Sequence, residues 1–426
     1  MRKLKYVPII LLIPMFLLSC QSGSTTLATE SPTTITPSSQ PTDTPTSSVT
    51  TTVTPTEVMI QECSIPSGSP PLPRLDVAQD IPNEIVGFLN GGGSLDELLK
   101  ILSESAQLPN WDSAFTVEDL DGDGYLDQIV TILNPTPEAI QAEGMLLLLT
   151  CQGAQYELAF LLPVVPGWSV PIVLSIEDLN NDCIADLTVG RETCGAHTCF
   201  TDIQFITWTG SHFENRFEGS SQDIPSPIIE IVLDPKHISV TAGGINSVGA
   251  GPYRSFIRRW AWDPDLGLMA PSKDELLPAE FRIHKLLDAE ESYLQEDFNQ
   301  ALILYRQVIE SEDLLDWIDP TVEQANLGAY ALFRIMLTHI ISDQLTDAES
   351  AYKLLVDSFN SEGPGFAYAE MGRTFWEVYQ ETSKAESACA TARAYASTHP
   401  EAILDPLYFG YTNPTYSPED ICPEGL

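Results

Sequence analysis

The sequence predicts a multidomain α+β protein in which a β-rich region is followed by an all-helical one. Between residues 58 and 275, short runs rich in β-branched and aromatic residues alternate with turn-forming Asp, Asn and Gly, which is typical of antiparallel strands. From Leu276 to residue 426, apolar residues recur at the three- and four-residue spacing of amphipathic helices. The chain of 426 residues is long enough for two or three such domains.

The N-terminal segment has the organisation of an export signal. Basic residues in the first five positions precede an apolar run that ends at Leu18 and is too short to span a bilayer comfortably. The motif Leu17-Leu18-Ser19-Cys20 resembles the bacterial lipobox. This resemblance implies that residues 1–19 are removed and that Cys20 carries lipid. An ordinary secretory signal with an incidental cysteine is the alternative. We expect a protein of the cell envelope, lipid-anchored on its extracytoplasmic side, with the outer surface favoured.

Composition limits the possible partners. Residues 20–57 are mostly Ser, Thr and Pro, so we expect a disordered linker that places the folded part roughly 30 Å from the bilayer. The formal net charge is −40, from 60 acidic and 20 basic residues. This charge argues against nucleic acid and anionic lipid as partners, because a protein that binds either of them needs a basic surface. It is compatible with calcium, although solubility outside the cell explains it equally well.

The cysteines predict disulfides, because exported proteins fold under oxidising conditions. Seven follow the proposed lipidation site: Cys63, Cys151, Cys183, Cys194, Cys199, Cys389 and Cys422. Cys194 and Cys199 bracket a four-residue turn and should join a hairpin, while Cys389 and Cys422 should tie the C-terminal tail to a helix. Among the other three, one must be left over, and spacing does not decide which. A metal or redox role for Cys194 and Cys199 with His197 is a weaker alternative.

Two Asp-rich loops carry the clearest chemical signal. The first offers ligand oxygens at positions one, three, five, seven (a carbonyl) and nine, from Asp119, Asp121, Asp123, Tyr125 and Asp127. The second repeats the pattern with Asp178, Asn180, Asp182, Ile184 and Asp186. Alternating oxygens suit calcium, which takes six to eight of them at short range. Position twelve of the first loop is Val130 instead of glutamate, and strand-forming residues surround it, so this is not an EF-hand.

The two loops resemble the calcium loops of FG-GAP and related integrin-type repeats, in which an Asp-rich loop joins two strands of a propeller blade. The resemblance implies calcium-stabilised β units, here three of roughly fifty residues each. Because a complete ring needs more than twice this length, we expect an open, partial propeller-like assembly. In the second loop Cys183 replaces the usual glycine at position six, which strains the turn or places the thiol in a bridge. The alternative is a pair of Asp-capped turns held by their own backbone hydrogen bonds.

The helical region resembles tetratricopeptide repeats. Small and aromatic residues that fit three helical pairs are Ala289, Phe298, Ala301, Leu302 and Tyr305, then Ala348, Tyr352 and Leu355, then Phe375, Tyr379, Ala388 and Pro400. The resemblance implies a curved platform that holds a protein or peptide partner. The match is loose, because the usual Trp-Leu-Gly of the first helix is missing. A helical domain that only packs on the β region is the alternative.

No catalytic motif is evident. The sequence contains no metalloprotease helix motif, nucleophile elbow or Walker loop, and its six histidines are dispersed. We therefore expect a non-catalytic binding or scaffolding protein. A secreted carbohydrate-active enzyme or other hydrolase is the alternative, because glycosidase sites leave no local signature. A third possibility is an envelope protein that only spaces or stiffens the surface.

Overall fold

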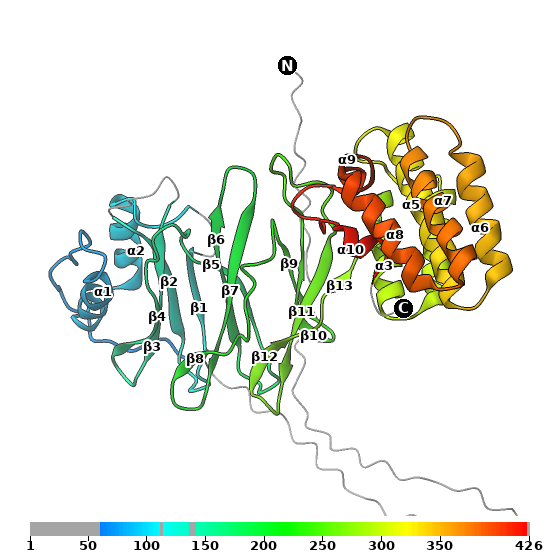
Figure 1. Ribbon diagram of the computed structural model, residues 1–426. Helices are drawn as coiled ribbons and strands as arrows, with labels where there is room; N and C mark the ends of the chain where they lie inside the picture. The colour runs from blue at the N-terminus through cyan, green and yellow to red at the C-terminus, as the bar shows by residue number, and fades with distance from the viewer. Residues whose placement is uncertain (1–59, 111–113, 136–141, 424–426) are drawn as a thin grey trace, which may run out of the picture.

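The computed structural model describes residues 60–110, 114–135 and 142–423. It contains three antiparallel sheets, none of which is closed, and a separate group of helices, so the protein mixes α and β structure as expected (Figure 1). The expected signal peptide, the lipidation site at Cys20 and the linker of residues 20–57 lie outside the described residues. Within the described ranges, no helix is both long and apolar enough to cross a bilayer.

Each sheet is built mainly from four strands that are consecutive in the chain. The first contains β1 (Phe115–Glu118), β2 (Asp127–Leu133), β3 (Gly144–Cys151) and β4 (Tyr156–Leu162). The second contains β5 (Ile172–Glu177), β6 (Asp186–Cys194), β7 (Cys199–Trp208) and β8 (Phe213–Asn215). The third contains β9 (Ile228–Leu233), β10 (Lys236–Thr241), β11 (Phe256–Asp263) and β12 (Leu268–Pro271), and β13 (Glu275–Leu276) also pairs with β11.

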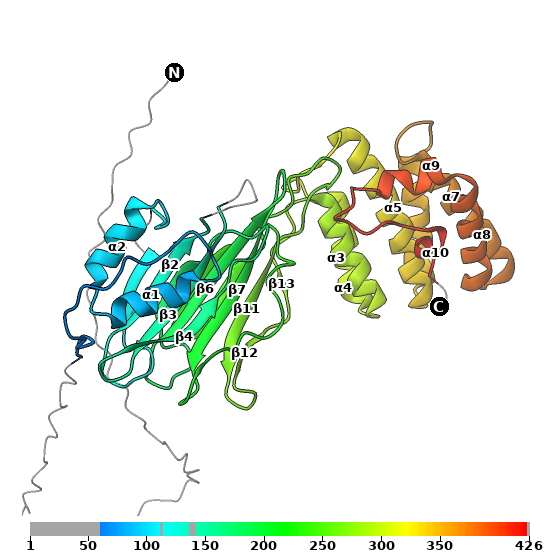
Figure 2. The same cartoon turned by 90° about the vertical axis from the view of Figure 1, so that its left-hand side faces the viewer.

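The sheets stack face to face, as Figures 1 and 2 show, with two short helices, α1 (Ile81–Asn90) and α2 (Leu95–Glu104), over the first. Side chains of β3 alternate between two apolar clusters. Leu147 and Leu149 pack with the helices, whereas Leu146 and Leu148 pack against the second sheet. A strand buried on both faces needs apolar residues at successive positions, which explains the run of four leucines.

The second sheet also packs on both faces, against the first sheet on one side and against the third sheet on the other. Leu187 and Val189 of β6 belong to the cluster with the first sheet. Phe205 of β7 belongs to the cluster with the third sheet, where it meets Ile238 and Trp260. Burial of these side chains is the main favourable contribution to the stack. The alternation of apolar residues between two faces therefore explains why three small sheets form one continuous body.

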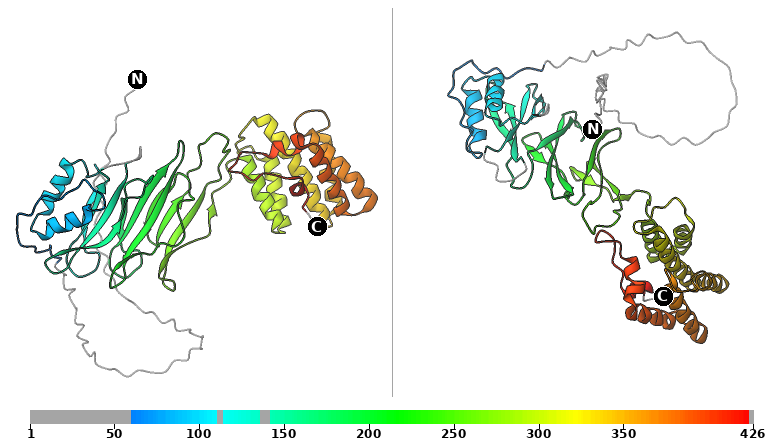
Figure 3. Two further views of the ribbon diagram at one scale, coloured as in Figure 1. Left: turned by 60° about the vertical axis from the view of Figure 1, so that its left-hand side comes forward. Right: turned by 90° about the horizontal axis from the view of Figure 1, so that it is seen from above.

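The helical part begins after β13. Its main helices are α3 (Arg282–Leu294), α4 (Phe298–Glu310), α5 (Pro320–Ile341), α6 (Leu345–Ser358), α7 (Phe366–Thr382) and α8 (Ala385–Thr398). Two short α-helices, α9 (Pro400–Ile403) and α10 (Pro418–Ile421), and one 3-10 helix, η2 (Asp405–Leu407), follow. The six main helices pack as three consecutive pairs around a common core, beside the third sheet (Figure 3). Asp297 and Asp319 begin α4 and α5 by accepting hydrogen bonds from backbone N–H groups of the first turn.

Three disulfides lie within the described residues. Cys194–Cys199 closes the β6–β7 hairpin, and Cys389–Cys422 joins α8 to the C-terminal tail, as the sequence predicts. Cys63–Cys151 attaches the segment before α1 to β3, which pairs two of the three cysteines left open above. A bridge that spans 88 positions restricts the unfolded chain more than a short one does, so this disulfide adds stability to the first sheet.

A buried ion pair lies at the centre of the helical part. Arg334 of α5 is fully buried and lies 2.6 Å from Glu290 of α3, and the hydroxyl of Tyr305 donates to the same carboxylate over 2.8 Å. The guanidinium also lies over the ring of Tyr293, 3.9 Å from its centroid. These contacts join α3, α4 and α5. If either residue were replaced by an uncharged one, the other would remain as a buried charge without a counter-charge.

Replacing one partner of this pair should therefore be costly. We expect Arg334→Met to lower the free energy of unfolding by about 3–5 kcal/mol, because Glu290 is left buried without a counter-charge. Urea denaturation followed by helical circular dichroism measures the change. The exposed Arg306, replaced in the same way, is the control and should change stability little. The double variant Arg334→Met/Glu290→Leu should recover most of the loss. An equally small effect at both arginines would contradict the role of the pair.

Candidate functional site

The first Asp loop joins β1 to β2 and folds around its own carboxylates. Asp119 accepts hydrogen bonds from the backbone N–H groups of Gly122 (2.8 Å) and Gly124 (3.0 Å). Both glycines have left-handed backbone conformations, with φ of 73° and 87°, which side chains rarely adopt. Asp127, at the start of β2, accepts from the N–H of Leu120 at 2.9 Å. The glycines therefore let the chain turn tightly enough to bring distant carboxylates together.

Three of the five predicted ligands converge. Carboxylate oxygens of Asp119, Asp121 and Asp127 lie within 4.8 Å of one another. Burial and the neighbouring carboxylates raise the pKa of Asp121 to about 6 and the pKa of Asp127 to about 7. Asp123 is exposed and lies outside this cluster, where it accepts from the N–H of Tyr125 at 2.8 Å. Crowded, partly desolvated carboxylates fit a hard cation, which would relieve their repulsion.

Backbone pairing fixes the far side of the same loop. Gln61 donates to the carbonyl of Gly124 and accepts from the N–H of Leu126, both at 2.9 Å. The carbonyl of Tyr125, expected to supply the oxygen at position seven, takes part in neither bond. It therefore remains compatible with that expectation.

The second loop, between β5 and β6, has the same backbone. Asn181 and Cys183 occupy the positions of the two glycines, with φ of 65° and 71°. Asp178 accepts from their N–H groups at 2.7 Å and 3.3 Å, and Asp186 accepts from the N–H of Leu179 at 2.8 Å. These bonds match those of the first loop position by position. The repeat expected from the sequence is therefore present as a structural repeat, with Cys183 in the left-handed conformation.

The chemistry of the second loop nevertheless differs. The side-chain amide of Asn180 donates to Asp182 at 2.9 Å and to Asp186 at 3.2 Å, and the ammonium of Lys236 lies 3.1 Å from Asp178. These donors already neutralise or bond the carboxylates that a cation would bind. The contacts of the predicted set, Asp178, Asn180, Asp182, Ile184 and Asp186, therefore favour the alternative, a self-contained turn, over a metal site. Lys236 lies far from the loop in sequence, so no local pattern could reveal its contact.

Both loops also bury one leucine between sheets. Leu120 follows the first aspartate of its loop and lies in the cluster between the first and second sheets. Leu179 has the equivalent place between the second and third sheets. Each is only 1% exposed. The conformation of each Asp loop is thereby coupled to the packing of the stack.

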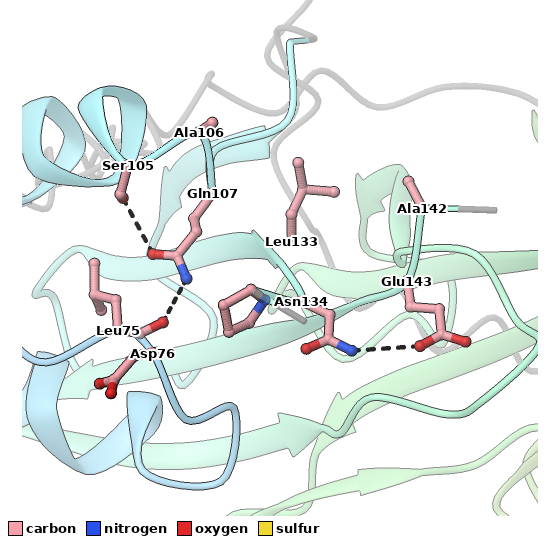
Figure 4. A pocket seen from close by; sticks show the side chains of 10 residues that line it. Leu75, Asp76, Ser105, Ala106, Gln107, Leu133, Asn134, Ala142 and Glu143 are labelled. Atoms are coloured by element: carbon pink, nitrogen blue, oxygen red, sulfur yellow. Dashed lines mark hydrogen bonds between the residues drawn. The ribbon is translucent and has the colours of Figure 1, made fainter. Parts of the chain in front are cut away.

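A cleft beside the first sheet contains paired polar groups (Figure 4). It has a volume of about 560 Å³. The side-chain amide of Gln107 donates to the carbonyl of Leu75 at 2.6 Å and accepts from the hydroxyl of Ser105 at 3.1 Å, while Asn134 donates to Glu143 at 3.3 Å. The first two bonds lie within the helical cover and the third joins the ends of β2 and β3, while the N–H of Leu133 donates to the carbonyl of Gln107 at 2.8 Å and connects the cover to the sheet. Their mutual pairing indicates a structural role.

A second cleft lies between the sheet stack and the helices. It has a volume of about 930 Å³ and is lined by the β10–β11 loop, β13, α3, α4 and the C-terminal tail. Leucines supply much of its apolar lining: Leu276, Leu287, Leu294 and Leu304. A concave, largely preformed space between two modules is the usual location of a ligand site.

Two polar side chains in this interdomain cleft have atoms without hydrogen-bond partners among the described residues. His284 is 3% exposed, and its Nε2 lies 3.1 Å from the carbonyl of Pro252. Because a carbonyl only accepts, Nε2 carries the proton, and Nδ1 is an acceptor without a donor. Burial lowers the pKa of His284 and favours this neutral form. Arg254 uses Nη2 for Asp288 at 3.3 Å, while its Nε and Nη1 have no partner.

The sequence could not identify this interdomain cleft as a site. Arg254 is one of three arginines close together in the sequence. The other two form ion pairs with acids, since Arg258 lies 2.6 Å from Asp274 and Arg259 lies 2.6 Å from Glu275. Only the docking of the helices places Arg254 near His284.

The buried carboxyl of the second loop should make stability depend on pH. Burial raises the pKa of Asp186 to about 6, so the folded protein holds this proton more tightly than the unfolded chain. Its contribution to stability should be complete below about pH 4 and lost as the pH rises to about 6, by up to roughly 3 kcal/mol. Chemical denaturation in the presence of a chelator measures the free energy of unfolding at each pH in this range. That free energy should change less steeply with pH for Asp186→Asn than for the wild type. The exposed Asp182→Asn is the control, and equal slopes for both variants would contradict the assignment.

Comparison with known proteins adds no relative. No family model, curated protein or solved structure matches the chain. The loops and clefts described above are therefore the features that indicate a function.

Proposed function

We propose that this chain is a lipid-anchored, extracytoplasmic, non-catalytic protein that binds or scaffolds a protein or peptide partner. The lipobox-like motif at Cys20 supports the anchor, and the acidic composition supports a location away from nucleic acid. In this proposal the sheet stack is a rigid spacer between the anchor and the binding module. The stacked sheets resemble successive blades of a partial propeller, and the helical pairs resemble tetratricopeptide repeats.

The proposed binding site is the interdomain cleft. Its apolar lining can bury side chains of a partner, and the atoms without partners on His284 and Arg254 require a donor and an acceptor. A peptide segment supplies both, through its N–H and C=O groups. Unpaired polar atoms that are buried destabilise a protein unless something else compensates. A bound segment would provide that compensation.

We also propose that the first Asp loop binds calcium through Asp119, Asp121 and Asp127. Three converging carboxylates, two of them with raised pKa values, support this assignment. Bound calcium would supply positive charge at a point where the chain otherwise concentrates negative charge. The residues themselves position the β1–β2 hairpin and keep Leu120 between the first and second sheets.

Calcium should therefore stabilise the protein through the first loop alone. For residues 58–426, calcium at tenfold its dissociation constant should add about 1.4 kcal/mol relative to EDTA. A thermal melt should shift upward by a few degrees. Asp121→Ala should abolish the shift, whereas Asp182→Ala in the second loop should retain it. No shift in the wild type, or equal losses in both variants, would contradict calcium binding at this loop.

Site-specific crosslinking tests the binding role. A photoreactive amino acid at Leu294, an exposed residue that lines the interdomain cleft, should capture one reproducible partner in intact envelopes. The same probe at Leu72, which is equally exposed near the first sheet, is the matched control. Arg254→Ala should reduce the crosslink at Leu294. Identical products at both positions, or none at Leu294, would count against a partner in this cleft.

A further inference from the structure

A free strand edge borders the interdomain cleft. In β13, Leu276 lies opposite Phe256 of β11. The next pair is hydrogen-bonded, because the N–H of Leu277 donates to the carbonyl of Ser255 at 2.9 Å. Hydrogen-bonded and non-hydrogen-bonded pairs alternate along an antiparallel ladder. The N–H and C=O groups of Leu276 therefore point away from β11.

The other side of β11 leads to the same conclusion. The carbonyl of Phe256 accepts from the N–H of Ala242, just after β10, at 2.9 Å, so the backbone groups of Phe256 point toward β10. Within the described ranges, neither the backbone of Leu276 nor that of Asp274, two residues earlier, has a hydrogen-bond partner. Both residues line the interdomain cleft. The cleft therefore contains backbone donors and acceptors that are free to pair with a ligand.

The rest of this sheet edge is already covered. The N–H of Met269 in β12 donates to the carbonyl of Arg216 at 2.8 Å, and the N–H of Glu218 donates to the carbonyl of Met269 at 3.0 Å. Folded proteins commonly cover a strand edge, because its unpaired backbone groups invite another chain to pair with it. Only the part at β13 stays open beside the cleft, and Leu276 there is 56% exposed.

Helix α3 runs alongside this edge and forms the opposite wall of the cleft. Nε2 of His284 lies 3.1 Å from the carbonyl of Pro252, and one turn later Asp288 lies 3.3 Å from Arg254. Successive turns of α3 thus follow the chain as it enters β11. Figures 1 and 2 both show α3 next to β13. The cleft is therefore a groove between a strand edge and a helix.

The free backbone groups decide what kind of occupant fits this groove. A helix has paired its own backbone groups and offers none to Leu276. An acyl chain has no hydrogen-bonding group at all. An extended polypeptide has both groups available, and its successive side chains point to opposite faces. Those on the side of α3 would meet Leu287 and Leu294, which line the cleft.

We propose that the interdomain cleft binds an extended segment of another protein, which pairs with β13 as an added strand. This rests on the proposed binding role of the cleft and specifies the form of the occupant. Main-chain hydrogen bonds to a strand edge provide affinity, and contacts of alternate side chains provide specificity. The segment should therefore carry large apolar residues at every second position, facing the leucines of α3.

Substitution of Leu276 tests the pairing in the full chain. Leu276→Pro removes the N–H that points into the cleft and keeps the pairs of β13 with β11, since an edge strand accepts proline where its N–H is free. With a photoreactive amino acid at Leu294, this variant should lower capture of the partner in intact envelopes about tenfold, because a carbonyl of the partner loses its donor. Leu276→Ile keeps the N–H and should lower capture less than about twofold. Thermal melts of both variants verify that the fold is retained.

A second test leaves the protein unchanged. Mass spectrometry of the crosslink at Leu294 identifies the captured segment, and a synthetic peptide of that sequence is titrated onto the full lipidated chain in detergent. N-methylation at two positions that are two residues apart should weaken binding about tenfold each, and N-methylation between them should have little effect.

The outcomes separate the binding mode from the binding role. Equal effects of N-methylation at all positions, or equal capture by the two Leu276 variants, would overturn strand addition while the proposed role of the cleft stands. Crosslinks that map to a second copy of this chain would overturn the assignment to another protein. No capture at Leu294 would overturn the binding role and the strand mode together.

Discussion

Burial of apolar side chains on both faces of the first two sheets is the constraint on which the rest of the structure depends. A four-stranded sheet of this size has too little core to be stable alone, so each must share its faces with a neighbour. The continuous apolar run of β3 and the alternation in β6 and β7 satisfy that requirement. The Asp loops follow from it, because Leu120 and Leu179 complete the two interfaces and thereby determine where the carboxylates lie.

The two Asp loops have the same backbone geometry but different side-chain contacts. Their backbone hydrogen bonds are equivalent. In the first loop backbone N–H groups donate to the crowded carboxylates, whereas in the second loop a side-chain amide and an ammonium group contact them as well. A single substitution, Asn180 in the place of Asp121, accounts for much of the difference, since an amide can donate where a carboxylate only accepts. Two loops with the same backbone can therefore present different side-chain groups to a ligand.

Local patterns predicted much of the fold. The change from strand-like to helical spacing near Leu276, the strand after the first Asp loop and two of the disulfides follow from neighbouring residues. The features that could not be predicted are those that depend on docking over long sequence separations. Lys236 reaches Asp178 only because the third sheet packs on the second. His284 loses water only because the β10–β11 loop and the tail cover α3, and nothing in its immediate sequence indicates burial.

The C-terminal tail connects the two halves of the molecule a second time. One connection is the short covalent segment between β13 and α3. The other is the set of bonds from Thr412 and Asn413 to Ala250 and Pro252, and the Cys389–Cys422 bridge then attaches the same tail to α8. Any force that acts between the two halves is divided between these two parallel connections. The tail thus makes the junction resist bending and twisting as well as extension, which a single linker cannot do.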